Sequence, residues 1–207
     1  MTNGNILKSI TKFAIPCIIS RIIQNLYPLI DSLIVGKILS LDSLAAVGLA
    51  GSVYSLFNDT LIGLVSGFAI IVGKKYGAKN EKEVKGVFAN SLTASVVLCL
   101  ILSVLGILFS KQLLVLLQTP ESLIGIGSIY LNVIFLGLLP NTVYNFISEM
   151  LRALGDSKKP LYLLIISSVL HLLLIIPLTK TWGVYGSGLA NVFSYLITII
   201  IGCAIIF

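Results

Sequence analysis

The chain has 207 residues, of which 57% are hydrophobic and only 11% are charged, and its mean hydropathy is +1.06. An ordinary soluble domain carries about 25% charged residues, so this composition excludes one and indicates a membrane protein. The net charge of +6 does not point to nucleic acid, because the basic residues lie in short segments between apolar blocks, where membrane topology requires them.

Six apolar blocks separated by polar segments predict an all-α polytopic membrane protein with six transmembrane helices in one domain, residues 1–207. The expected spans lie near residues 13–39, 44–72, 87–109, 123–151, 161–178 and 185–207. Each is about long enough to cross a hydrocarbon core of roughly 30 Å at about 1.5 Å per residue.

The first block carries an acid in a stretch that otherwise suits the bilayer. Asp31 stands at a depth where insertion scales assign a charge a cost of about 2.5–3.5 kcal/mol. Pro28 lies one turn earlier and removes the backbone donor that the carbonyl of Gln24 would need, so the helix can bend there. An acid beside a weakened backbone is the feature on which we base a mechanism of cation binding and release.

Further ionisable groups fall within or near the other blocks. Each is expected to face the bundle interior or a wet cavity, because a charge facing lipid is costly. Arg21 either extends toward the cytoplasm or pairs with Glu149, and Asp59 is either functional or a satisfied interior acid. The polar candidates for the wall of a cavity are Arg21, Gln24, Asn58 and Asp59.

Asp31 and His171 are both expected roughly 10–13 Å below the outer helix ends, counted at about 1.5 Å per residue. They could form a proton-titratable pair, because histidine changes charge nearest physiological pH. Alternatively, His171 bonds a helix backbone or a hydroxyl such as that of Ser167. Glu149 and Arg152 stand three apart on one helix face, which favours an interfacial ion pair over a substrate contact.

Lysine and arginine are unequally divided between the two sides of the predicted bundle. Ten lie on one side and three on the other, with Arg21 inside a span. This bias predicts a multi-pass protein of the cell membrane with both termini in the cytoplasm. The last block stops at Phe207 without a polar tail, which predicts the front portion of a longer protein.

Motifs of enzymes and redox sites are lacking. The sequence has no H-E-x-x-H, no G-x-S-x-G and no P-loop, so we expect no enzymatic activity, no cofactor and no metal site apart from a coupling ion. The three cysteines, Cys17, Cys99 and Cys203, each lie inside an apolar block without C-x-x-C spacing. They are expected to be unbridged thiols.

Several motifs occur in a characteristic order. The first group is AIP at 14–16, QNLY at 24–27, DSLIVG at 31–36 and LAAVGLA at 44–50. The others are GKKYGA at 73–78, LRALGDSKKP at 151–160 and GVYGSGLA at 183–190, of which LRALGDSKKP is the most specific. Together they cover nearly the whole chain and resemble the N-terminal lobe of the multidrug and toxin extrusion (MATE) family.

The resemblance implies a transporter of two six-helix lobes around a central cavity, which exports organic cations against a gradient of Na⁺ or H⁺. This chain would supply one lobe. Its expected partners are therefore the lipid bilayer, a small organic cation as substrate, and a second lobe or a second copy of the chain. The family's first-helix acid falls on Asp31, and its bending proline falls on Pro16 or Pro28.

The chain departs from the family pattern at three positions. The fifth-helix Asn and Asp of many members read His171 and Ile175 here, and the sixth-helix Thr reads Asn191. The lost carboxylate and the gained imidazole disfavour an all-oxygen Na⁺ site at Asp31 and favour proton coupling. We expect Asp31, His171 and Asn191 to form the cation-coupling site, while coupling in the other lobe or a loss of function stays open.

Cation-coupled efflux of organic cations or drugs across the cytoplasmic membrane is the leading functional hypothesis. One alternative is a flippase for lipid-linked saccharides of the same superfamily. Such proteins usually line their cavity with several basic residues, and here only Arg21 qualifies. The other alternative is a truncated lobe that does not transport.

Overall fold

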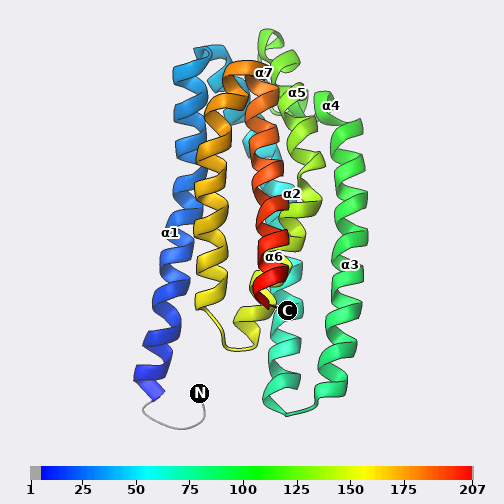
Figure 1. Cartoon of the computed structure of the whole chain (residues 1–207). Coiled ribbons are helices and arrows are strands. Elements are labelled where there is room, and N and C mark those ends of the chain that lie inside the picture. Colours follow the sequence, from blue (N-terminus) through cyan, green and yellow to red (C-terminus); the bar gives the residue numbers. More distant parts are fainter. Residues whose placement is uncertain (1–5, 207) are drawn as a thin grey trace.

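The structure, a computed structural model, describes residues 6–206, and over that range it consists of helices joined by short turns (Figure 1). In chain order these are α1 (Ile6–Ile38), α2 (Leu41–Gly77), α3 (Glu81–Leu108), α4 (Ser110–Leu116), α5 (Glu121–Leu136), α6 (Leu138–Ala153) and α7 (Lys158–Ile206). The all-α fold class is confirmed. Phe207, the end of the last predicted span, lies outside the described residues.

Four of the described helices are long and apolar enough to cross a membrane, and the count rises to five if α5 and α6 are taken as one bent span. These four are α1, α2, α3 and α7. The number of six spans stays a prediction.

The helix α7 reverses direction at Gly183, whose φ of 60° and ψ of −139° interrupt the helical geometry. Figure 1 shows the first arm rising to this turn and the second arm returning beside it. The arms pack closely, because a Cβ added at Gly202 would lie 3.2 Å from the Leu163 side chain. The spans predicted near 161–178 and 185–207 correspond to the two arms, although the residues between them are helical except at Gly183.

The region predicted as a span near 123–151 is divided between two helices in the structure. Helices α5 and α6 meet at Gly137 with a bend of 45°. Pro140 explains the break, because it has no N–H for the carbonyl of Leu136 and its ring crowds that carbonyl. The neighbouring carbonyl of Phe135 accepts a hydrogen bond from the Ser103 hydroxyl of α3.

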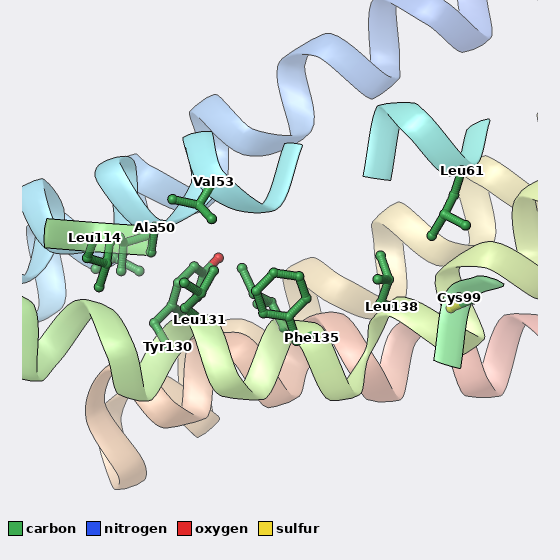
Figure 2. Close-up of a cluster of buried hydrophobic side chains, with 12 residues drawn as sticks. Ala50, Val53, Leu61, Cys99, Leu114, Tyr130, Leu131, Phe135 and Leu138 are labelled. Atoms are coloured by element: carbon green, nitrogen blue, oxygen red, sulfur yellow. The ribbon is translucent and has the colours of Figure 1, made fainter. Parts of the chain in front are cut away.

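A buried cluster joins α2, α3, α4 and α5 and fixes the height of α5. Figure 2 shows Tyr130, Leu131 and Phe135 of α5 facing Val53 of α2. The Phe135 ring meets Phe57 of α2 edge-on, with ring centroids 5.1 Å apart. Because lipid is as apolar as these side chains, close packing stabilises the contacts between the helices, and removal of the side chains from water does not. The cluster thereby holds Tyr130 at a fixed level beside α1.

The basic segments lie at one end of the bundle, as the unequal charge distribution requires. Figure 1 shows the α2–α3 and α6–α7 turns at the lower end, and the α1–α2 turn and the reversal of α7 at the upper end. The Asp156 carboxylate caps α7 by accepting hydrogen bonds from the amides of Lys158 and Lys159, at 3.0 and 3.1 Å. The expected ion pair between Glu149 and Arg152 is confirmed at 2.6 Å.

Candidate functional site

Asp31 is buried where α1 meets α5 and the first arm of α7, and only 5% of its surface is exposed. The hydroxyl of Tyr130 on α5 donates a hydrogen bond to its Oδ2 atom at 3.2 Å. The Nε2 atom of His171 on α7 lies 3.4 Å from its Oδ1 atom. Three helices therefore converge on one carboxylate, and the sequence prediction correctly brought Asp31 and His171 to the same depth.

His171 is itself almost fully buried, and its ring packs against that of Tyr27 of α1, with centroids 4.4 Å apart and ring planes inclined at 35°. The alternative hydrogen bond to Ser167 is not formed, because the hydroxyl of Ser167 and both ring nitrogens of His171 lack hydrogen-bond partners among the described residues. The imidazole is thus held by its contact with the Tyr27 ring and by its approach to Asp31.

Unsatisfied polar atoms gather around the carboxylate. Among the described residues, Oδ1 of Asp31, the hydroxyl of Tyr27 and both ring nitrogens of His171 have no hydrogen-bond partner. Buried polar atoms are usually paired, since leaving one unpaired costs about 1–3 kcal/mol. A cluster of such atoms is therefore suited to receive a proton or a small cation.

The donor set fits a proton better than a sodium ion. The pair can hold one proton between Nε2 of His171 and Oδ1 of Asp31, with the Tyr130 hydrogen bond supporting Oδ2. Sodium is a hard cation like calcium and magnesium, which take oxygen ligands. The side chain at 3.4 Å from Oδ1 is His171, which offers nitrogen and not oxygen.

Asp31 opens onto a cavity of about 530 Å³ between α1, α2, α5, α6 and both arms of α7. Asn191, predicted to join the coupling site, lines this cavity together with Asp31. The four polar wall candidates also line it: Arg21, Gln24, Asn58 and Asp59. Pro28 lies on the wall, whereas Pro16 is not among the lining residues. Both prolines lie inside the continuous helix α1.

A network of amides joins α2 to α6 in the cavity wall. The amide of Asn141 donates hydrogen bonds to Oδ1 of Asn58 at 2.6 Å and to the hydroxyl of Tyr54 at 2.9 Å. Asn145, one turn further along α6, donates to Oδ1 of Asn141 at 2.8 Å. Because Asn141 follows the break at Gly137, the bend between α5 and α6 directs this network into the cavity.

The sequence interpretation missed several residues of this site. The cavity is lined by five tyrosines, which are Tyr27, Tyr54, Tyr130, Tyr144 and Tyr195, and by two asparagines of α6, which are Asn141 and Asn145. The sequence did contain a signal for these residues, which is the presence of amides and hydroxyls inside apolar spans, where they need polar partners. Of the two alternatives for Arg21, the pair with Glu149 is not formed, since Glu149 pairs with Arg152 and the guanidinium of Arg21 contacts Gln24 at 3.4 Å.

Comparison with known proteins agrees with this architecture. A model of the MatE family matches residues 16–176. The chain is 32% identical over 203 residues to the "Probable multidrug resistance protein YoeA" of Bacillus subtilis (strain 168), covering 95% of this chain and 44% of that protein. It is 36% identical over 177 residues to the "Probable multidrug resistance protein YpnP" of the same organism, covering 84% and 39%.

A solved structure described as MATE in the bent conformation has the same fold. It superposes with a TM-score of 0.89 at 25% sequence identity, over 96% of this chain and 45% of that one. The chain thus spans less than half the length of each of these three proteins.

Proposed function

The chain belongs to the MatE family, and on that premise we propose that it is the N-terminal half of a secondary transporter that exports organic cations or drugs in exchange for a coupling cation. The observation that carries the proposal is the buried Asp31 carboxylate at the wall of a cavity, within 3.4 Å of His171. A cavity of about 530 Å³ falls within the range of roughly 300–1,000 Å³ that holds drug-sized molecules.

The second lobe is part of this proposal. The cavity is bounded on one side by α1 and on the other by α2 and α6, and the matched relatives are more than twice as long as the matched region. We propose that a second lobe, or a second copy of this chain, closes the cavity, and that the assembly is a multi-pass protein of the cell membrane with both termini in the cytoplasm.

A proton is the coupling ion that we propose. In the loaded state, one proton is held between Oδ1 of Asp31 and Nε2 of His171, and the pair has one positive charge more than in the unloaded state. The additional charge disfavours a cationic substrate in the adjoining cavity. Because Pro28 weakens the backbone one turn away, α1 is the element that we propose to bend when the proton binds.

The test is export by the protein with both lobes in proteoliposomes, under a pH gradient or a Na⁺ gradient imposed separately. We expect the pH gradient to drive export, and Asp31→Asn to abolish it with unchanged protein yield. Asp42→Asn, an exposed acid in the first turn of α2, is the matched control and should export normally. Export by the Asp31→Asn protein at the wild-type rate would overturn the coupling role, and export driven only by Na⁺ would overturn the choice of ion.

The flippase alternative is supported less well. Phosphate groups of lipid-linked saccharides require several basic side chains. Among the residues that line the cavity, Arg21 is the one Lys or Arg.

A further inference from the structure

A groove of about 480 Å³ lies on the outer face of α3, away from the central cavity. Helix α3 packs against α2, α5 and α6, and none of its residues lines the central cavity. Figure 1 shows α3 at the edge of the bundle, on the side opposite to α1. A second lobe that closes the central cavity beside α1 would therefore leave this α3 groove facing lipid. The groove is lined by Asn90, Thr93, Ala94, Val97, Leu98 and Ile101.

The α3 groove has the depth of one leaflet of a bilayer. From Asn90 to Ile101 the helix rises about 17 Å at about 1.5 Å per residue, and half of a hydrocarbon core of roughly 30 Å is about 15 Å. The small side chain of Ala94 leaves a depression beside the larger Val97 and Ile101, which are both exposed. A single acyl chain of a phospholipid thus matches the upper part of the groove in length and in polarity.

Two lysines lie at the foot of the α3 groove, toward the turn between α2 and α3. Lys82 is 11 residues before Thr93, so at about 100° per residue the two side chains lie on nearly the same face of the helix. Lys85 lies on the neighbouring face. Both lysines are exposed, and neither forms an ion pair with any described residue. Two positive charges are therefore available at this end of the groove.

The acidic residues of the same turn do not cancel these charges. Glu83 already forms an ion pair with Lys75 of α2. Glu81 is nine residues before Asn90, so it lies on the opposite face of α3 from the groove. The foot of the groove thus has a positive charge that is complementary to an anionic headgroup.

Asn90 places an amide between the lysines and the apolar part of the α3 groove. Its side chain is exposed and forms no hydrogen bond with any described residue, whereas the hydroxyl of Thr93 donates to the carbonyl of Ala89 at 3.0 Å. An amide that faces lipid needs a polar partner. The ester carbonyls of a phospholipid lie between its phosphate and its acyl chains, so they can accept a hydrogen bond from Asn90.

We propose that the α3 groove binds one anionic phospholipid from the leaflet at the lysine-rich end of the bundle. Lys82 and Lys85 bind the phosphate, Asn90 bonds an ester carbonyl, and one acyl chain lies along Ala94 and Ile101. The order of charge, amide and apolar surface along the helix is the order of phosphate, ester and chain in the lipid. The inference requires only that α3 crosses the membrane, so it stands or falls independently of the proposed transport.

Two lipids with identical chains test the proposal. Dioleoyl phosphatidylglycerol is anionic, and dioleoyl phosphatidylcholine has no net charge. Each is titrated into the purified full chain in detergent, and native mass spectrometry measures the fraction of protein with one lipid bound. We expect the anionic lipid to bind about twentyfold more tightly, because each lysine near an anionic headgroup contributes about fivefold.

Charge variants assign the headgroup contacts. Lys82→Gln and Lys85→Gln should each lower the affinity for the anionic lipid about fivefold and leave that for phosphatidylcholine unchanged. Lys158→Gln is the matched control, because Lys158 is an exposed lysine without an ion pair to any described residue, on the other turn at the same end. It should change neither affinity.

A packing variant assigns the acyl chain. Ala94→Phe fills the α3 groove and should weaken the binding of both lipids. Val104→Phe is its control, because Val104 is exposed about two turns beyond Val97 and outside the groove lining, and it should bind both lipids normally. Equal unfolding temperatures of the two variants show that the exposed substitutions leave the fold intact.

Equal affinity for the two lipids would overturn the inference, and so would unchanged binding by Lys82→Gln or by Ala94→Phe. An equal loss of affinity in Lys158→Gln would show a diffuse attraction to the positive end of the bundle in place of a site. A dimer of the chain that Ala94→Phe dissociates would assign the groove to a second copy. Gradient-driven export is measured separately, and its absence would leave the lipid site unaffected.

Discussion

At the scale of single residues, the site depends on two side chains, each of which approaches a different oxygen of the Asp31 carboxylate. Tyr130 donates to Oδ2 of Asp31, which leaves Oδ1 toward His171. A phenol hydroxyl gives its proton to a carboxylate only as a hydrogen bond, whereas an imidazole can carry the proton itself. In the proposed mechanism, His171 is therefore the residue that distinguishes proton coupling from a site that only holds a carboxylate in place.

Replacing His171 by Asn, the residue that the family resemblance implies at this position, tests that distinction. The variant keeps a polar amide beside Asp31 but cannot be protonated, so we expect export driven by a pH gradient to fall about tenfold or more. The measurement is the initial rate of export in proteoliposomes at equal protein content.

The control for this change is Ser168→Ala, on the same arm of α7 but outside the cavity lining. It should export at the wild-type rate. If His171→Asn also did so under a pH gradient, the imidazole would have no part in coupling.

Some contacts of the site could be predicted from the sequence alone, and others could not. Asp31 and His171 could be paired, because their depths follow from counting residues along straight helices. Tyr130 could not be found in this way, since its approach to Asp31 depends on the height of α5, which the buried cluster around Phe135 sets through contacts between distant segments. The functional role of Asp31, His171 and Asn191 stays a prediction.

At the scale of helices, the break between α5 and α6 brings Asn141 to the cavity wall. Gly137 is needed at the break, because a Cβ there would lie 2.7 Å from Cγ2 of Val192 on the second arm of α7. The sequence contained the cause, Pro140, but a proline inside an apolar span does not reveal how far the helix bends. The direction of the bend depends on what the neighbouring helices leave free, here the Ser103 hydroxyl that bonds the Phe135 carbonyl.

A substitution at Gly137 tests this packing. We expect Gly137→Ala to lower the free energy of unfolding by about 1–3 kcal/mol, because the added methyl group overpacks against Val192. Thermal unfolding of the purified protein in detergent measures the change. Gly63→Ala on α2 is the matched control, since nothing lies within 4 Å of the added Cβ, and it should unfold at the wild-type temperature or slightly above.

An unchanged unfolding temperature for Gly137→Ala would mean that α5 and α6 do not approach the second arm of α7 as described.

For the long helix α7, the sequence predicted the spans but not the way in which they are joined. Its two arms were predicted as separate spans from the hydropathy pattern, but the tight reversal was not. A single residue with positive φ, Gly183, replaces the polar connection that the sequence led us to expect.

At the scale of the whole molecule, the distribution of charge predicts the orientation of the bundle in the membrane. The turn between α2 and α3 and the turn between α6 and α7 share one end of the bundle, and both are rich in lysine. This grouping is the one that the positive-inside rule requires of cytoplasmic turns. The fold could be anticipated because hydropathy and charge act over whole segments, in contrast to the site, which depends on individual contacts.

Labelling of single cysteines tests the orientation. In a protein whose Cys17, Cys99 and Cys203 are replaced by Ser, Asn80→Cys lies in the α2–α3 turn and Thr181→Cys lies beside the reversal of α7. We expect a membrane-impermeant maleimide to label position 181 in intact cells and position 80 only after the cells are opened. Labelling of position 80 in intact cells would reverse the proposed topology.

The proposed transport depends on one step, in which the carboxylate of Asp31, deep in the wall of the cavity, exchanges a proton for the substrate. The most direct measurement is the proton released when a cationic substrate is added to the purified two-lobe protein in weakly buffered solution, followed with a pH-sensitive dye. We expect release by the wild-type protein and by Asp42→Asn, and none by Asp31→Asn. Equal release by the Asp31→Asn protein would contradict it.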